Sequence, residues 1–289
     1  MQPQGVILFI LLQLSTAEPC SINKNIKLTN ETQLQIEIAL KGFECKIQPL
    51  PNLSTNILGD IRIEYDSSSL ACSLDYQKAN RIGQLSIIGG QEEVQPQPRQ
   101  GGEAEKSLQM INGLKNNCIM SFTPSLPIYL DMELGMGNSN IDLSGLKIAK
   151  LKLSVSGNTT LSFNSPNPIR CQEMYISAGI SKFNSQLLGN AGFEVLYFNG
   201  RVGSYTIDLR GNFTGTKRVE ITSGPGNIRL ILPKKTGIRL KPTGFSIKSI
   251  PELKKDAEGW YQSDNWAIVD NKLIIHIDGS IGRLKVEFL

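Results

Sequence analysis

The sequence predicts an all-β protein in which the C-terminal two-thirds of the chain is a β-solenoid, a stack of short coils built by a single chain. Three observations favour this fold class. Apolar and polar residues alternate with a period of two from Gln33 to the C-terminus, and no long segment shows the period of an amphipathic helix. Beyond Pro127, a unit of strand, glycine turn and strand recurs at a nearly constant interval, within the range typical of solenoid repeats.

The first element that we expect is a signal peptide over residues 1–17. An apolar run, Val6–Leu12, precedes small residues at positions 15–17, which is the arrangement found before a leader cleavage site. The run is too short to span a bilayer, which takes roughly 20 apolar residues. A lipid-modified Cys20 is the alternative, but Pro19 precedes it where such sites have a small residue. We therefore expect a mature chain without a transmembrane segment that is extracytoplasmic: secreted, periplasmic or on the cell surface.

An N-terminal β region is expected over residues 18–126. Gln33–Leu40 alternates strictly, so its apolar residues share one face of a strand. Further strands are expected at Phe43–Gln48, Asp60–Tyr65, Ala71–Gln77 and Gln84–Ile88. From Gln91 to Lys106 the chain is rich in proline, glycine and charge and poor in apolar residues, which predicts a flexible loop, with a short helix as an option over residues 103–114.

The solenoid is expected over residues 127–289, and glycine marks its repeat. In five copies the last glycine falls at Gly137, Gly157, Gly179, Gly203 and Gly226, and a second short alternating strand follows the turn. One unit exposes an apolar stripe that only a neighbouring unit can cover, so the units should stack as one coil each. A β-sandwich with evenly spaced hairpins is the alternative, and the regular spacing favours the solenoid.

The end of the chain predicts one or two more coils and a cap. Inward faces are expected for Leu273, Ile275 and Ile277 of one strand and for Leu284, Val286 and Phe288 of the last. Gly259–Trp266 is a candidate for the cover that the open end of a stack requires. Its tryptophans, Trp260 and Trp266, could offer two rings to a sugar, but packing of the cap is the favoured interpretation.

Two parts of the chain carry a family resemblance. Leu130–Gly137, followed by Ile141–Leu146, resembles the opening of the bacterial toast-rack family, which includes LiaF-like C-terminal domains and adhesin-type domains of unknown function. Leu232–Leu240 and Leu273–Gly282 are similar to the closing coils of that family. The resemblance covers nearly the whole mature chain and implies a right-handed single-chain β-helix with no catalytic residues to carry over. Members that act in envelope-stress signalling carry membrane helices before this domain, where we expect only a leader.

The cysteines give no metal or redox motif. Five of them stand singly in the sequence, at Cys20, Cys45, Cys72, Cys118 and Cys171. The absence of a C-x-x-C pair argues against a zinc site or a thioredoxin-like motif. In an oxidising compartment some could pair, and the odd number leaves at least one unpaired, but buried free cysteines are an equal alternative.

Catalytic motifs are not evident, and we expect no enzyme and no cofactor. The one histidine, His276, lies two residues from Asp278 on a predicted outward face, where a solvated surface pair is a better interpretation than a catalytic triad. Metal-ligand spacings do not occur. The segments Gly135–Gly137 and Gly224–Gly226 lack the third glycine and the lysine of a phosphate loop, so they are interpreted as turns.

A basic stretch is the one candidate binding feature. Residues 217–255 contain ten lysines or arginines against two glutamates, whereas the whole chain has a net charge of +4. Alternation predicts that Arg229, Arg239 and Lys241 point outward and form a polyanion-binding face. The expected partner is an anionic cell-envelope polymer or another surface protein, and not a nucleic acid. The alternative is that acidic residues from other coils offset this charge.

These observations predict a secreted or cell-surface, non-catalytic structural or interaction module, with cell-envelope association or adhesion as its role. An extracytoplasmic regulatory or sensor domain for envelope stress is the alternative. A polysaccharide-active enzyme is less favoured, because coils as short as the glycine spacing indicates leave little chain for the long loops that wall a catalytic groove.

Overall fold

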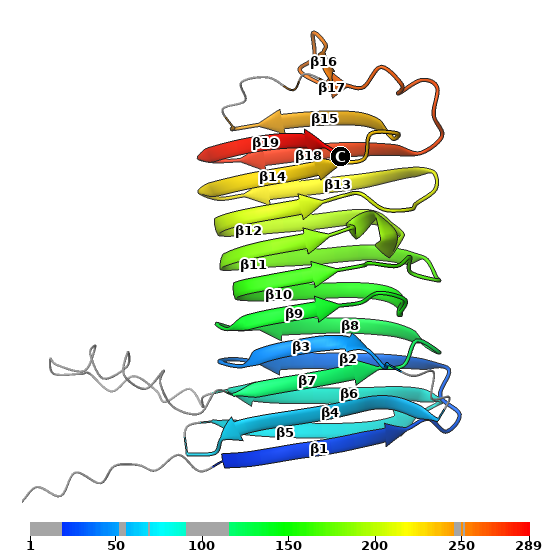
Figure 1. The fold of residues 1–289 in the computed structure, drawn as a ribbon, viewed down its shortest axis with the longest axis vertical. Helices are drawn as coiled ribbons and strands as arrows, with labels where there is room; N and C mark the ends of the chain where they lie inside the picture. The colour runs from blue at the N-terminus through cyan, green and yellow to red at the C-terminus, as the bar shows by residue number, and fades with distance from the viewer. Residues whose placement is uncertain (1–18, 52–55, 69, 91–115, 246–249, 251) are drawn as a thin grey trace, which may run out of the picture.

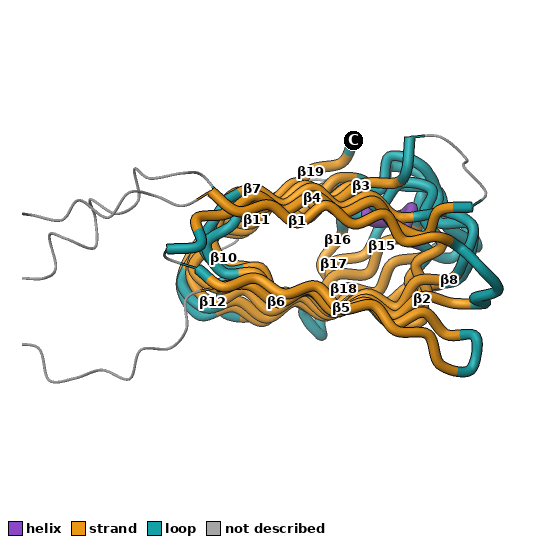
Figure 2. The backbone as a smooth tube through the Cα atoms, turned by 90° about the horizontal axis from the view of Figure 1, so that it is seen from below, coloured by secondary structure: helices purple, strands orange, loops and turns teal. Residues whose placement is uncertain are grey.

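The computed structural model describes residues 19–51, 56–68, 70–90, 116–245, 250 and 252–289. Its strands form a stack of flattened coils, seen from the side in Figure 1 and along the stack in Figure 2. The all-β class is confirmed, because the described chain contains strands and one short 3-10 helix, Leu188–Ala191. The expected signal peptide at 1–17, the loop at 91–106 and the optional helix at 103–114 lie outside the described residues.

Two facing sheets form the walls of the stack (Figure 2), and we number them sheet 1 and sheet 2. Sheet 1 contains, in spatial order, β1 (Pro19–Lys27), β4 (Ile57–Asp66), β7 (Asn117–Phe122), β3 (Glu44–Pro49), β9 (Asn138–Asp142), the second halves of β10 (Lys147–Ser162), β11 (Cys171–Gln186) and β12 (Phe193–Asp208), then β14 (Gly226–Leu232) and β19 (Gly282–Phe288). Sheet 2 contains β5 (Ala71–Ala79), β6 (Ile82–Gly90), β2 (Gln33–Leu40), β8 (Pro127–Leu134), the first halves of β10, β11 and β12, then β13 (Thr216–Ser223), β18 (Lys272–Gly279), β15 (Gly237–Thr243), β17 (Tyr261–Gln262) and β16 (Lys254–Lys255).

The core lies between the sheets and consists of apolar side chains stacked in register from strand to strand. One such ladder contains Ile38, Met132, Leu153, Ile176, Phe198, Ile221 and Ile277, each at most 2% exposed. Burial of a side chain of this size contributes about 1.5 to 3 kcal/mol. The inward and outward alternation expected from the sequence is therefore confirmed along both walls.

The middle of the stack follows the predicted repeat. Parallel coils succeed one another in chain order from β8 and β9 to β13 and β14. The turn glycines Gly137, Gly157, Gly203 and Gly226 align, but Ser181 and not Gly179 occupies this position in the third coil. A Cβ atom on Gly203 would lie 2.0 Å from the Ser181 carbonyl oxygen, so the close approach of the neighbouring coil requires glycine. The right-handed winding of these coils stays a prediction.

At the N-terminal end, the spatial order departs from the chain order. Strand β2 lies between β6 and β8, and β3 lies between β7 and β9. The coil of residues 33–49 is thus inserted between the coils of residues 82–122 and 127–142. The expected boundary at residue 127 falls between hydrogen-bonded neighbours of one stack, and the division into two regions stays a prediction. Strands β1 and β7, which the sequence pattern did not predict, pair antiparallel with β4.

A second insertion occurs at the C-terminal end. Strand β18 lies between β13 and β15, and β19 pairs with β14. The segment after β15 contributes Ile250 and Leu253 to the core, with 4% and 7% of their surface exposed. Tyr261 of β17 packs against the same core, next to β15. The segment Gly259–Trp266 therefore lies at the end of sheet 2, where the sequence predicted a cover.

Candidate functional site

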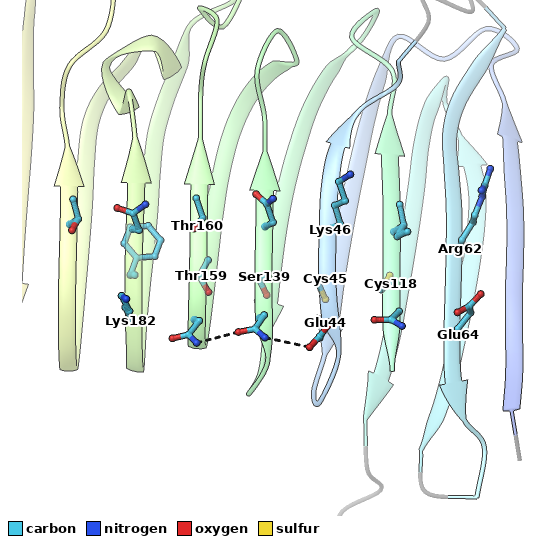
Figure 3. Close-up of a pocket in the computed structure, with 18 of the residues that line it drawn as sticks. Glu44, Cys45, Lys46, Arg62, Glu64, Cys118, Ser139, Thr159, Thr160 and Lys182 are labelled. Atoms are coloured by element: carbon cyan, nitrogen blue, oxygen red, sulfur yellow. Dashed lines mark hydrogen bonds between the residues drawn. The ribbon is translucent and has the colours of Figure 1, made fainter. Parts of the chain in front are cut away.

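A hollow of about 1070 Å³ runs across the outer surface of sheet 1 (Figure 3), and we call it the trough. Two rows of outward side chains flank it, each following one register position across neighbouring strands. The first row is Glu64, Asn117, Glu44, Asn138, Asn158, Lys182 and Ser204, and the second is Arg62, Ile119, Lys46, Asn140, Thr160, Asn184 and Thr206. The trough therefore runs along the stack, from β4 at one end to β12 at the other.

The alternation of each strand builds the trough. Residues of the two rows are two positions apart, so they project from the same face of the sheet, while the residue between them points into the core. Cys45, Thr159 and Phe183 are such intermediate residues, each at most 4% exposed. The backbone between the rows therefore forms a narrow floor with mostly polar side chains on both sides.

Side-chain amides form a ladder along the first row. Asn158 Nδ2 donates to Asn138 Oδ1 at 3.2 Å, and Asn138 Nδ2 donates to Glu44 Oε1 at 3.4 Å (Figure 3). An amide carries both donors and an acceptor, so such a ladder can bind hydroxyl, carboxylate or amide groups of a ligand. This ladder was not expected from the sequence, although the pairs Gly137-Asn138, Gly157-Asn158 and Gly226-Asn227 repeat a Gly-Asn signal at the turns.

Beyond the trough, both rows continue into basic residues. Ser204 is followed by Asn227 and Arg283, and Thr206 is followed by Arg229 and Lys285 (rows in β14 and β19). Glu287 accepts hydrogen bonds from Arg229 Nη2 and Lys285 Nζ, each with an N to O distance of 2.6 Å. These hydrogen bonds, with Arg229 as the larger contributor, lower the pKa of Glu287 from 4.5 to about 2.

The structure separates the three residues predicted as one polyanion face. Arg229 lies outward on sheet 1 in β14, in line with the second row of the trough. Arg239 and Lys241 lie on sheet 2 in β15, and so on the opposite wall of the stack. Arg239 and Lys241 are brought together, but Arg229 joins a different surface. Polyanion binding by any of them stays a prediction.

Trp260 covers the pair on sheet 2. Arg239 Cζ lies 4.6 Å and Lys241 Nζ 5.5 Å from the centre of its ring, and the His276 ring meets it edge-on at 4.8 Å. The other tryptophan, Trp266, has Lys272 Nζ 5.2 Å from its ring centre. A cation therefore lies against each tryptophan ring. This favours the interpretation that the tryptophans pack at the end of the stack, and not that they offer two free rings to a sugar.

The cysteines are free thiols in the structure. Cys45 and Cys118 are register neighbours on β3 and β7, and both are buried together with Cys171. Burial raises the pKa of the Cys45 and Cys171 thiols to about 12, so these groups are weak nucleophiles at neutral pH.

In the part of the chain that the structure describes, no group of three or more His, Cys, Asp or Glu side chains is placed to hold a metal ion. Among the same residues, no helix is long and apolar enough to cross a bilayer.

Comparison with known proteins identifies the family. Residues 15–184 match the N-terminal domain of toast_rack (DUF2154), and none of the curated proteins matches the chain. The chain also matches two solved structures. One is a candidate cell adhesion protein from Clostridium sporogenes, with 14% identity over 94% of this chain and 100% of its own and a TM-score of 0.47. The other is a candidate adhesin from Bacteroides fragilis, with 12% identity over 92% of this chain and 97% of its own and a TM-score of 0.37. The family match covers more than half of the 289 residues, so the chain belongs to the toast-rack family that the segments after Leu130 resemble.

Proposed function

We propose that this protein is a non-catalytic, extracytoplasmic surface module that binds an extended anionic polymer of the cell envelope along sheet 1. The observation that carries the proposal is the trough, because two rows of mostly polar side chains repeat along the stack from strand to strand. The apolar run and the small residues over positions 1–17 support export. The adhesion role suggested by the names of the two solved proteins is compatible with such a module.

A polymer fits the trough because both would be periodic. Neighbouring strands of a sheet lie about 4.7 to 4.9 Å apart, so equivalent side chains of one row recur at that interval. A chain of repeating sugars or polyol units laid along the stack can contact successive strands with the same chemical groups. A rigid solenoid would hold the backbone positions of these contacts in place, which lowers the ordering cost on the protein side.

The charge of the two rows favours an anionic polymer. Counted through β19, the rows contain more cations than carboxylates: Arg62, Lys46, Lys182, Arg229, Arg283 and Lys285 against Glu64 and Glu44. Ion pairs offset part of this excess of positive charge. Arg62 pairs with Asp60 at 3.2 Å, and Glu287 pairs with both Arg229 and Lys285. Lys46 and Lys182 line the middle of the trough together with Glu44 and Glu64, and the proposal assigns the contacts with the anionic polymer to these two lysines.

Binding of polygalacturonate by calorimetry, with salt raised from about 0.05 to about 0.3 M, tests the proposal. The double variant Lys46→Gln with Lys182→Gln should bind about 5- to 30-fold more weakly, because each solvent-exposed ion pair is worth roughly 0.5 to 1 kcal/mol. Affinity of the wild-type protein should fall as salt rises, because the Debye length shortens to less than about 10 Å.

The matched control removes two positive charges from the opposite sheet, as Arg239→Gln with Lys241→Gln. We expect this variant to bind the polymer as tightly as the wild type. If it weakens binding while the Lys46 and Lys182 variant does not, the polymer binds beside Trp260 and the trough is rejected. Absence of wild-type binding at the lowest salt rejects an anionic ligand altogether.

A further inference from the structure

Sheet 2 carries a second hollow, of about 700 Å³, on the wall opposite the trough. Its two rows of outward side chains cross β5, β6, β2, β8 and β10. One row is Gln77, Gln84, Gln35, Tyr129 and Lys150, and the other is Asp75, Ser86, Glu37, Asp131 and Lys152. We call it the Tyr129 hollow.

We propose that the Tyr129 hollow binds a neutral hexopyranose chain, with one sugar ring stacked on the phenol ring of Tyr129. A pyranose presents C–H groups on its faces and hydroxyls around its edge. A site for it therefore combines an accessible aromatic face with surrounding amides and carboxylates. The hollow contains both, and it goes beyond the proposed function because it lies on the other sheet and takes an uncharged ligand.

Tyr129 presents the aromatic surface. It points outward from β8 with 40% of its surface exposed, and its register neighbours are Gln35 on one side and Lys150 on the other. The pairing of β8 with β10 is irregular at this point: the register shifts between Ile148 and Lys150, which makes Ala149 an extra residue. A bulge of this kind changes the direction of nearby side chains and is over-represented beside binding sites.

Side-chain amides supply hydrogen-bonding groups next to the ring. Gln84 Nε2 donates to Gln35 Oε1 at 3.5 Å, and Gln77 Nε2 donates to the Asp75 carboxylate at 2.8 Å. These contacts fix the orientation of the amides and leave further donors and acceptors at the hollow. Because the rows repeat from strand to strand, hydroxyls of consecutive sugars would meet equivalent groups.

The charge of the hollow disfavours the polyanion proposed for the trough. Three carboxylates, Asp75, Glu37 and Asp131, face two cations, Lys150 and Lys152. Lys152 Nζ is also paired with Asp131 at 2.8 Å, and Lys150 Nζ lies 3.8 Å from Glu173. With both lysines paired in this way, two carboxylates of the hollow, Asp75 and Glu37, are left over. Such a surface repels an anionic polymer and leaves neutral polyols as the matching class.

A path for a longer chain continues from the hollow. Beyond Lys152 the same register position is occupied by Tyr175 and then Tyr197. Their rings are stacked, with centres 4.8 Å apart and planes inclined by 7°, and Tyr197 is 37% exposed. Lys150 Nζ also lies 5.9 Å from the centre of the Tyr175 ring. A chain that leaves Tyr129 along the stack would therefore meet these two tyrosines within the next strands.

Titration with cellohexaose, followed by saturation-transfer NMR and tyrosine fluorescence, tests the proposal. Wild-type protein should transfer saturation to the C–H protons of the sugar. Tyr129→Ala should lower affinity by at least about 5-fold, the scale of a lost aromatic contact of roughly 1 kcal/mol. Tyr129→Phe should keep most of the affinity, because stacking needs the ring and not the hydroxyl.

Ile88→Ala is the matched control, because Ile88 is an exposed apolar residue, 52% accessible, on the same sheet and outside the hollow. It should bind as the wild type does. Equal binding by Tyr129→Ala, or no saturation transfer in the wild type at millimolar sugar, overturns the proposal. The Tyr129→Ala variant should bind polygalacturonate as the wild type does. The Lys46 and Lys182 double variant should likewise keep its affinity for cellohexaose, so that the proposals for the two sites are tested independently.

Discussion

The middle coils and the two ends of the stack are built from the same kind of strand but are assembled differently. In the middle, each strand pairs with the equivalent strand of the next unit in the chain, as Leu130 does with Leu151. At the N-terminal end Leu34 is opposite Ile128, and at the C-terminal end Thr216 is opposite Lys272, so both pairs join segments that other strands separate in the sequence. Local repetition thus builds the centre, whereas both ends need an inserted coil from elsewhere in the chain.

This difference shows where the stability of the stack should lie. A middle coil is covered on both sides by neighbours whose side chains are in register, so its inward residues are fully removed from water. Among the strands that the structure describes, the last strand of sheet 1, β19, pairs only with β14, and its inward residues Val286 and Phe288 are partly buried. We therefore expect the same substitution to cost more in the middle than at this edge.

The largest effect is expected for an inward charge in a middle coil. Ile221→Asp should unfold the stack around β13, because an unpaired buried carboxylate costs several kcal/mol against a total stability of about 5 to 15 kcal/mol. Val286→Asp at the edge should cost less, because its carboxylate can reach water. Urea denaturation followed by circular dichroism measures both free energies of unfolding.

Glu220→Ala is the control for the middle coil, since Glu220 is the outward neighbour of Ile221 and should change stability by less than about 0.5 kcal/mol. A larger loss for Val286→Asp than for Ile221→Asp would contradict the comparison and place the stability at the inserted end.

The sequence predicted the middle coils well for the same physical reason. Period-two alternation determines which residues face inward, and the glycine spacing reports the length of one coil, so both can be obtained from local pattern. The places of β2 and β18 could not be obtained in this way, because the alternation of apolar and polar residues is satisfied equally well next to any parallel strand. Their positions depend on which coils fit together over long sequence separations.

A substitution at a turn glycine of a middle coil should have the second largest effect. Gly203→Ala would place its Cβ 2.0 Å from the Ser181 carbonyl oxygen, so the two coils must move apart. We expect a loss of about 1 to 3 kcal/mol, the usual cost of overpacking. Gly59→Ala, on β4 near the N-terminal end, meets Phe122 at an ordinary 3.4 Å and should change stability by less than about 1 kcal/mol.

Thermal unfolding of the two glycine variants measures this difference. Equal losses would mean that the turn of a middle coil can relax, and that the close approach of Gly203 to the Ser181 carbonyl oxygen does not limit the spacing of the coils.

The candidate site was predictable in part. Alternation correctly places Arg229 and Arg239 on the outer surface. However, the strands of both sheets show the same alternation of inward and outward residues. The sequence therefore could not tell that Arg229 belongs to sheet 1 and Arg239 to sheet 2. The trough and the Tyr129 hollow were missed for a related reason, because their residues come from strands far apart in the chain, as with Arg62 and Asn184 in the trough.

The smallest expected effect compares two carboxylates at opposite ends of the molecule. Burial raises the pKa of Glu31, but hydrogen bonds from the backbone N–H of Thr29 and from the Tyr76 hydroxyl outweigh it and lower the pKa from 4.5 to about 2. The pKa of Glu287 is also lowered to about 2, but its partners Arg229 and Lys285 are exposed by 48% and 73%. Both groups bind protons more weakly in the folded than in the unfolded chain, so their contribution to the free energy of unfolding is complete above pH 4.5 and is lost as the pH falls toward 2.

Glu31→Gln should therefore reduce the acid-induced loss of unfolding free energy by about 1 to 2 kcal/mol. Glu287→Gln should reduce it by no more than about 0.5 kcal/mol, because solvent screens its ion pairs. Urea midpoints between about pH 6 and about pH 2.5 measure the two slopes, and a steeper change for Glu287→Gln than for Glu31→Gln would show that the C-terminal ion pairs stabilise the protein more than the buried carboxylate does.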